Sequence, residues 1–173
     1  MSETLTAWPR QDAASLNAFY GNPDTNHDGV ADRAWEDANL TRLAPAYRMA
    51  LAWDKTKQVS AIRVHKKCAA SLDRILHGIL AHYGTQEAIE AARMHLFGGC
   101  YAFRMKRSGS TLSNHSWASA IDLDPERNGF GVRWRPDAGM MPEAVVALFA
   151  AEGWVWGGKW GTADAMHFQA ARL

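Results

Sequence analysis

The stretch Ser113–Asp124, SNHSWASAIDLD, places a histidine ahead of a run in which apolar and acidic residues alternate. Such alternation is typical of a β-strand, in which successive side chains point to opposite faces. Asp122 would then face away from the core, into which Ile121 and Leu123 point. One interpretation is a surface turn that leads into a half-buried strand. The other is that His115 and Asp122 hold the same metal ion.

A second stretch near the end of the chain, TADAMHFQ, offers partners for this pair. We expect MHFQAARL to form a closing strand, with His167 and Gln169 on one face and Phe168 on the other. Asp164 lies three residues before His167, so it can share that face only from a turn that precedes the strand. The glycine in KWGTAD allows such a turn.

These residue types fit a catalytic zinc site. Such a site takes three ligands from His, Asp or Glu and keeps a fourth position for water, whose pKa the metal lowers to about 7. His115, Asp122 and His167 supply that set. A carboxylate that is not a ligand must then take the proton of the water, and Asp164 is the candidate general base. Arg104, on a strand expected before His115, is the candidate to hold a substrate carboxylate or the developing oxyanion.

Helical patterns occupy much of the remaining chain. Apolar residues at helical spacing predict a long amphipathic helix that ends before Gly84; they are Leu72, Ile75, Leu76, Ile79, Leu80 and Tyr83. Shorter helices are expected in QDAASLNAFYG, TQEAIEAARMHL and MPEAVVALFAAEG. NPDTNHDGVADRAWEDANL is rich in turn-forming residues and predicts an ordered loop.

Strand patterns complete the fold class. AYRMALAW and QVSAIRVH flank the polar turn Asp54–Lys57 and predict a β-hairpin, and CYAFRMKR and ASAIDLD predict two further strands. Helices and antiparallel strands are segregated, without a βαβ rhythm. The sequence therefore predicts the α+β class, with a small antiparallel sheet flanked by helices.

The bulk composition limits the classes of function. The chain has 173 residues, 47% hydrophobic and 21% charged, which suits one domain over residues 1–173, expected as a monomer. A net charge of +1 argues against a nucleic-acid partner. The start, MSETLTAWPRQDAASL, lacks a basic region followed by an apolar one, and no membrane span is expected. We therefore expect a cytoplasmic protein that reaches the outside through a separate release system.

Three stretches together resemble a known family: SNHSWASAID, WGGKWGTADAMHFQ and the upstream CYAFRMKRSGSTLSNH. They are similar to zinc peptidases of the D-Ala-D-Ala carboxypeptidase and L-alanyl-D-glutamate peptidase type, including phage endolysins. The family pattern S-x-H-x-x-G-x-A-x-D gives two zinc ligands, and W-G-G with D-x-x-H gives the base and the third ligand. The resemblance covers roughly Gly98 to Gln169, in order as well as in content.

The resemblance implies a role for each matching residue. His115, Asp122 and His167 would hold one zinc ion per chain, Asp164 would be the general base, and Arg104 would anchor the substrate. It also implies a fold like that of these peptidases and of the related hedgehog signalling domain.

The implied substrates are the stem peptides of bacterial peptidoglycan. Ser113 and Trp156 would lie beside the site as substrate-binding residues and shape its floor. We expect an L-alanyl-D-glutamate endopeptidase of the phage endolysin kind, released by a holin-type pore or by lysis. A D-Ala-D-Ala carboxypeptidase and a non-catalytic, zinc-stabilised binding domain are the alternatives.

One position departs from the family pattern. Ala118 stands where the pattern has glycine, in HSWAS. If the backbone there needs a positive φ, alanine costs about 1–2 kcal/mol and can shift His115 relative to Asp122. We expect the activity to be reduced rather than lost, because the ligands and the base are all present.

Other motifs are weaker or absent. Asp24, Asn26 and Asp28 match the start of a calcium loop, but Trp35 stands where a bidentate Glu is required, so a loop rich in Asx turns is the alternative. No H-E-x-x-H zincin motif and no G-x-S-x-G nucleophile elbow occurs.

The remaining histidines, cysteines and tryptophans suggest ordinary structural roles. His65, His77, His82 and His95 are expected to be packed or surface residues, and Cys68 and Cys100 to be buried free thiols. Most tryptophans should fill the core. Trp156 and Trp160 can either do the same or line a substrate groove.

Overall fold

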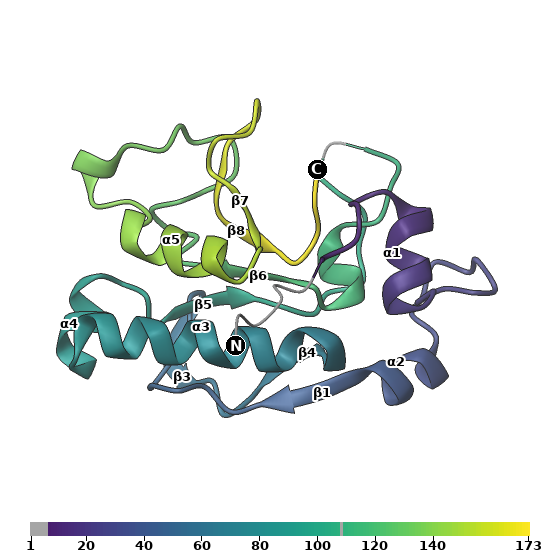
Figure 1. The fold of residues 1–173 in the computed structure, drawn as a ribbon, viewed down its shortest axis with the longest axis horizontal. Helices are drawn as coiled ribbons and strands as arrows, with labels where there is room; N and C mark the ends of the chain where they lie inside the picture. Colours follow the sequence, from purple (N-terminus) through teal and green to yellow (C-terminus); the bar gives the residue numbers. More distant parts are fainter. Residues whose placement is uncertain (1–6, 108) are drawn as a thin grey trace.

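The structure, a computed structural model, describes residues 7–107 and 109–173 and has the predicted α+β class. Residues 1–6, part of the stretch expected to lack a signal sequence, lie outside the described range. The helices are α1 (Ala13–Tyr20), α2 (Arg33–Asn39), α3 (Lys66–Tyr83), α4 (Gln86–Ala91) and α5 (Glu143–Ala151), with 3₁₀ turns η1 (Asn114–Trp117) and η2 (Pro136–Ala138). Figure 1 shows α1 and α2 at one end of the molecule.

Two sheets organise the strands. The larger has the order β3 (Asp54–Gln58), β2 (Ala50–Leu51), β5 (Leu96–Gly99), β6 (Ala120–Leu123), β8 (Asp164–Gln169) and β7 (Val155–Gly157). The smaller pairs β1 (Leu40–Leu43) with β4 (Ile62–His65). Neighbours in the larger sheet are antiparallel except β2 and β5, which are parallel, so the predicted antiparallel sheet contains one parallel pair.

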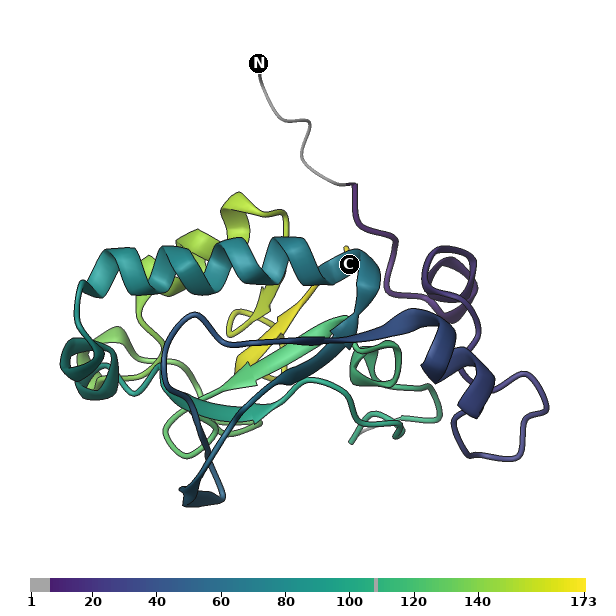
Figure 2. The ribbon, with the colours of Figure 1, turned by 90° about the horizontal axis from the view of Figure 1, so that it is seen from below.

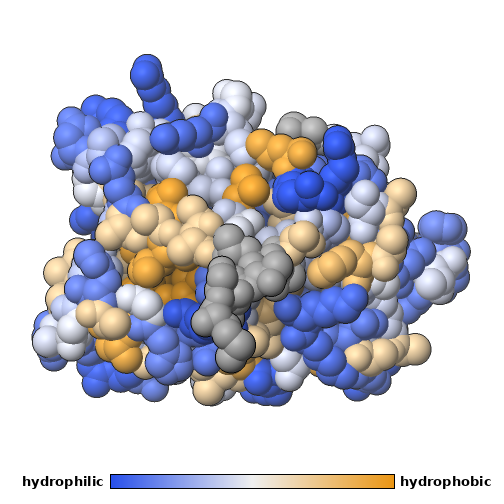
Figure 3. All heavy atoms as spheres, in the orientation of Figure 1, coloured by the Kyte–Doolittle hydropathy of each residue, from blue (hydrophilic) through white to orange (hydrophobic). Residues whose placement is uncertain are grey.

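Helices α3 and α5 cover one side of the larger sheet (Figure 2). Leu72, Ile75, Leu76 and Ile79 are buried along α3, as their spacing predicts, and the helix ends at Gly84, whose φ is +76°. From β6 and β8, Ile121 and Phe168 enter the same core, where Phe168 stacks on Phe149 of α5 at 3.8 Å between ring centroids. In Figure 3, hydrophobic residues gather where α3 and α5 meet. No helix in the described part of the chain has both the length and the apolar character that a membrane crossing requires.

The predicted hairpin was wrong in its turn and its pairing. Strands β2 and β3 do form a hairpin, but it turns at residues 52 and 53, and all of Asp54–Lys57 belongs to β3. β4 pairs instead with β1, which begins at Leu40, the last residue of the stretch expected to be a loop; α2 lies within that stretch. Polar residues predominate in β3 and in the stretch that contains α2, so their sequences predicted turns and loops rather than regular structure.

The predicted strand at residues 100–107 was also wrong. The strand in this region is β5, which ends at Gly99, and the following chain makes only the isolated bridge Met105–Leu112. Backbone bonds from Ser113 N to Arg104 O (2.9 Å) and from Lys106 N to Thr111 O (2.9 Å) fold this segment back on itself. Arg104 therefore lies on a folded-back loop rather than on a strand.

Hydrogen bonds join the two ends of the described chain. Gln11 N donates to Arg172 O at 2.8 Å, and Arg172 N donates to Pro9 O at 2.7 Å. The Arg172 Nε also donates to Trp8 O at 2.8 Å. These contacts bring the segment before α1 beside the end of β8, next to the site described below.

Candidate metal centre and active site

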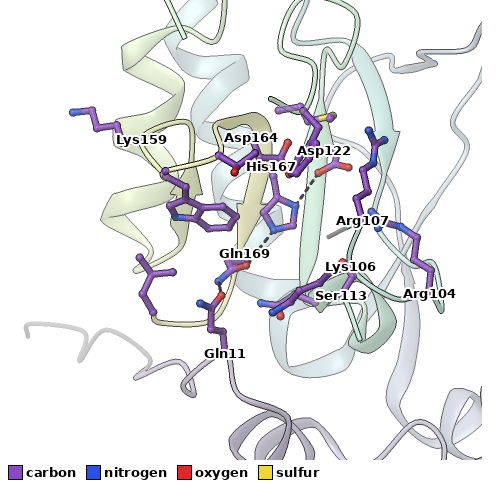
Figure 4. Close-up of a pocket in the computed structure, with 17 residues that line it drawn as sticks. Gln11, Arg104, Lys106, Arg107, Ser113, Asp122, Lys159, Asp164, His167 and Gln169 are labelled. Carbon is purple, nitrogen blue, oxygen red and sulfur yellow. Dashed lines mark hydrogen bonds and ion pairs between the residues drawn. The ribbon is translucent and has the colours of Figure 1, made fainter. Parts of the chain in front are cut away.

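The pairing of β6 with β8 brings the two stretches singled out in the sequence together. Asp122 and His167 lie directly opposite each other in the antiparallel register, so their side chains share a face of the sheet. His167 Nδ1 lies 3.0 Å from Asp122 Oδ1 (Figure 4). Gly98 on β5 leaves the room for this carboxylate, because a Cβ there would lie 2.9 Å from the Asp122 Cβ.

His115 reaches the same point from η1. Ser113 caps this turn by accepting a hydrogen bond from the His115 N–H, and Ala118 ends it in the left-handed region at φ 52° and ψ 34°. The positive φ considered from the sequence is therefore present. His115 Nε2 lies 3.2 Å from Asp122 Oδ1 and 3.2 Å from His167 Nδ1.

The outer nitrogen of each histidine fixes its tautomer. His115 Nδ1 lies 2.7 Å from the carbonyl oxygen of Cys100, which can only accept, so this nitrogen carries the proton. His167 Nε2 lies 3.2 Å from Gln169 Oε1, and the Gln169 amide nitrogen donates to Gln11 Oε1 and to Ala171 O. His167 Nε2 therefore also carries the proton.

Three electron-pair donors consequently converge on one point: His115 Nε2, Asp122 Oδ1 and His167 Nδ1. With neutral histidines these atoms repel one another unless a cation lies between them. The three residues could hold a metal ion, and two imidazoles with one carboxylate are a ligand set that zinc accepts. The hydrogen bonds to Cys100 and Gln169 orient the rings as outer partners of metal ligands usually do.

The charges in this cluster are mutually dependent. Burial favours the neutral form of Asp122, but His115 and His167 beside it outweigh this effect and hold the pKa of the carboxyl well below its usual range. Burial likewise disfavours protonated His167, yet the Asp122 carboxylate raises the pKa of this imidazole. The carboxylate is thus kept ionised, the form that a metal ligand requires.

Asp164 lies beside the cluster because β7 and β8 pair irregularly. Trp156 is opposite Phe168, but the next residue, Gly157, is already opposite Asp164. The intervening residues of β8 bulge, so the rule that strand positions three apart face opposite ways does not apply. Asp164 was expected in a turn before the strand, whereas it is the first residue of β8.

The environment of Asp164 differs from that of Asp122. Its Oδ1 is buried without a hydrogen-bond partner among the described residues. Burial raises the pKa of this carboxyl above its ordinary value. A carboxylate with a raised pKa next to a possible metal site accepts a proton more readily than an ordinary aspartate.

A cavity of about 670 Å³ opens beside these residues (Figure 4). Asp122, Asp164 and His167 line it, and so do Arg104 and Ser113, as expected from the sequence. The hydroxyl of Ser116 holds the Arg104 backbone, accepting from its N–H and donating to its carbonyl oxygen, both at 3.0 Å. The exposed guanidinium donates to Met105 O at 3.3 Å.

Trp156 is not among the residues that line the cavity, in contrast to the expectation that it shapes the floor. Its indole donates to Ala165 O at 2.8 Å and lies edge-on to Trp134, with ring centroids 5.1 Å apart. Its hydrogen bond thus ties β7 to the backbone of β8. Trp160 does line the cavity, and its Nε1 is buried without a partner among the described residues.

Several lining residues carried no signal in the sequence. Gln11 lies 158 residues from Gln169, with which it bonds, so only the folded chain shows that it reaches the site. Asn114 looked like a spacer between Ser113 and His115, but its buried amide lines the cavity without a partner in the described chain. The cations Lys106, Arg107 and Lys159 also line the cavity.

The Asp24 loop has the geometry of Asx turns. Asp24 accepts from the N–H groups of Asp28 and Gly29, and Asn26 Oδ1 also accepts from Asp28 N–H. Asp28 in turn accepts from Val30 N–H. Because these side-chain oxygens already bind the loop backbone, the arrangement gives no support to the calcium alternative.

The other structural residues behave as expected. Cys68 and Cys100 are buried free thiols. His65 is buried, and His77 is exposed with its Nδ1 on Asp73 O at 2.9 Å.

Comparison with known proteins bears on the same segment. Residues 106–170 match the family model described as D-alanyl-D-alanine carboxypeptidase. The predicted resemblance is thereby confirmed for the stretch that contains His115, Asp122, Asp164 and His167. Searches of curated proteins and of solved structures gave no significant match.

The match makes this segment similar to a family of carboxypeptidases that act on D-alanyl-D-alanine. It begins just after Arg104, so it does not extend to that residue. It also does not distinguish the phage endolysin kind from other members.

Proposed function

We propose that this protein is a zinc-dependent peptidase that cleaves the L-alanyl-D-glutamate bond in the stem peptide of bacterial peptidoglycan. The observation that carries the proposal is the convergence of three atoms that could bind a metal beside Asp164, whose buried Oδ1 has no hydrogen-bond partner among the described residues, in an open cavity. The family match over residues 106–170 supports the same chemistry.

Each residue would have a separate task. His115, Asp122 and His167 would hold the zinc ion, which supplies a Lewis acid for amide hydrolysis. A carboxylate oxygen of Asp164 takes the proton of the attacking water and passes it to the departing amine. Arg104 holds a substrate carboxylate or the developing oxyanion, and Ser113 lies beside it in the cavity wall.

D-Ala-D-Ala carboxypeptidase activity is the second candidate. It is favoured by the description of the matching family model, and the same ligands and base serve either reaction. The choice between the two bonds depends on the cavity walls rather than on the zinc ligands.

A non-catalytic zinc-binding domain explains less. A purely structural zinc site needs neither a buried carboxylate beside its ligands nor an open cavity next to it. Burying the Asp164 Oδ1 without a hydrogen-bond partner in the described chain costs stability, and a catalytic role gives a reason for that cost.

Release to the cell wall through a holin-type pore, or by lysis, belongs to this proposal as well. It rests on the resemblance to phage enzymes. Appearance of the protein outside intact cells that lack any pore-forming partner would contradict it.

Two variants separate holding the metal from using it. His115→Ala removes a ligand, so we expect bound zinc and turnover to fall together. Asp164→Asn leaves the three ligands untouched, so zinc should stay near one per chain while turnover falls by about 10²–10⁴. The measurements are zinc content by elemental analysis and release of α-amino groups from defined stem peptides, identified by mass spectrometry.

The same measurements can overturn the assignment. Loss of zinc from Asp164→Asn would make this residue a ligand, and full activity would move the base elsewhere. Products cut only at a D-Ala-D-Ala bond would favour the carboxypeptidase. Release of reducing sugars without amines would contradict a peptidase of either kind.

A further inference from the structure

The cavity beside the proposed zinc site is lined by more positive than negative side chains. Arg104, Lys106, Arg107 and Lys159 line it, and the acidic side chains that line it in the described chain are those of Asp122 and Asp164. The chain as a whole has a net charge of only +1. The cavity is therefore more positive than the average surface of the molecule, and both of its carboxylates have tasks in the proposed reaction.

None of these four cations forms an ion pair with a carboxylate within residues 7–107 and 109–173. The Arg104 guanidinium donates to a backbone carbonyl oxygen, that of Met105, and the Arg107 guanidinium lies 5.5 Å from the centroid of the Phe130 ring. Exposed cations elsewhere do have acidic partners, such as Lys57 with Asp54 at 3.1 Å.

The four cations lie on two walls. Arg104, Lys106 and Arg107 belong to the folded-back loop, and the loop's backbone bonds to Thr111 and Ser113 hold it in place. Lys159 follows β7 and lies on the opposite side of the cavity (Figure 4). Arg107 and Asp164 line the same cavity, so the loop's positive charge faces the space beside the proposed base.

We propose that these two walls select peptides with at least two free carboxylates, one bound by the 104–107 loop and one by Lys159. The inference rests on the proposed function and narrows its substrate class to stem peptides whose acidic groups are free rather than amidated. A peptide cut at an L-alanyl-D-glutamate bond carries one such carboxylate on the glutamate itself and a second at its C-terminus. A charged guanidinium recognises a carboxylate but not the neutral carboxamide of the same shape.

Two matched peptides test the selection. One is an L-alanyl-D-glutamyl stem tetrapeptide with free carboxylates, and the other has the same sequence with the glutamate and C-terminal carboxylates converted to carboxamides. Binding is measured by calorimetry on the zinc-loaded Asp164→Asn variant, in which we expect slow turnover to leave time for the measurement. We expect the acidic peptide to bind about tenfold more tightly or better at low salt, and the difference to shrink at about 0.5 M salt.

Charge variants assign the effect to the two walls. Lys106→Gln and Lys159→Gln, each made in the Asp164→Asn background, should weaken binding of the acidic peptide by about three- to tenfold and leave the amidated peptide unchanged. Lys57→Gln removes the same charge from the β2–β3 hairpin, away from the cavity, and should leave both affinities unchanged.

The outcomes separate this inference from the proposed function. Equal affinity for the two peptides, no binding of either, or an equal effect of Lys57→Gln overturns the inference, even if the wild-type enzyme cleaves both peptides. Selective binding of the acidic peptide without cleavage by the zinc-loaded wild type supports the selection and contradicts the peptidase.

Discussion

Ala118 occupies a backbone conformation that usually favours glycine. Its φ of 52° and ψ of 34° cost a residue with a side chain about 1–2 kcal/mol, and its methyl group is fully buried. Its carbonyl oxygen accepts the His65 N–H at 3.0 Å, which ties η1 to β4. The position thus joins the turn that carries His115 to the core.

We predict that Ala118→Gly changes the free energy of unfolding by less than about 1 kcal/mol. Relief of the strained φ is offset by the lost burial of one methyl group, worth about 0.8 kcal/mol, and by the greater freedom of glycine in the unfolded chain. Ala118→Val should lose about 3 kcal/mol or more, because a β-branched residue fits neither this backbone region nor the closed space. Urea denaturation of both variants measures these changes. A large gain in stability for the glycine variant would mean that the strain is greater than the geometry indicates.

The convergence of His115, Asp122 and His167 could be predicted at the level of single residues, since strand alternation and the order of the motifs point to the same side chains. The supporting residues could not. Gln169 was placed on the His167 face, but its hydrogen bond to His167 depends on the position of Gln11, which follows no local rule. Trp156 was misplaced because a tryptophan next to two glycines can point either into a groove or into the core.

The pairing of β7 with β8 sets the position of Asp164, because Gly157 lies against it. A Cβ at Gly157 would lie 2.6 Å from the Asp164 carbonyl oxygen and 3.1 Å from the Asp164 Cβ. Both atoms lie at the start of a strand, where they cannot move without shifting the carboxylate. The close approach of strands β7 and β8 therefore explains why the first position of the W-G-G motif after the tryptophan is a glycine.

We predict that Gly157→Ala lowers stability by about 1–3 kcal/mol and lowers peptide turnover, while most of the zinc is retained. The reason is displacement of Asp164, with the three ligands left on β6, β8 and η1. Gly129→Ala is the control, because a Cβ there meets only ordinary contacts at 3.6 Å. Turnover and zinc content of the two variants are compared. Unchanged turnover in Gly157→Ala would show that the bulge does not position the base.

Element types were predictable where a period repeats over several turns or strands, as in α3 and β6. They were not predictable where polar residues form regular structure at an edge. β3 has the sequence DKTKQ and lies at the edge of the larger sheet, so its charged side chains face solvent while its backbone pairs on one side only. From sequence alone, without knowledge of the strand that it pairs with, DKTKQ predicts a turn.

At the scale of the whole molecule, His65 links three parts of the fold. Its Nδ1 accepts from Lys67 N at 3.1 Å, at the start of α3, so its Nε2 carries the proton and donates to Tyr20 O at 3.0 Å. Burial lowers the pKa of this imidazole from 6.5 to about 4. Protonation of Nδ1 would remove the bond to Lys67.

We predict a loss of stability on acidification that depends on His65. Between pH 6.5 and about 4 the unfolded chain binds a proton that the folded chain does not, so stability is present above pH 6.5 and is lost as the pH falls. The contribution is at most about 3 kcal/mol. His65→Asn keeps a capping acceptor without a titratable group, so its stability deficit relative to the wild type should narrow from pH 7 to pH 4.5. Urea titrations at each pH measure this, with the exposed His77→Asn as the control. A constant deficit would contradict the prediction.

The order of strands in the larger sheet has a consequence for how the protein folds. β8 lies between β6 and β7 and brings His167 opposite Asp122, 45 residues earlier in the chain. Tyr20, near the start of the described chain, donates to Ala170 O at 2.7 Å, across 150 residues. Folding slows as contacts join more distant parts of a chain, because the loop must close before the contact stabilises it. Until β8 docks, His115 and Asp122 lack the third residue of the proposed metal site, so under the proposed function the docking of this strand would set the time at which a metal ion can be captured.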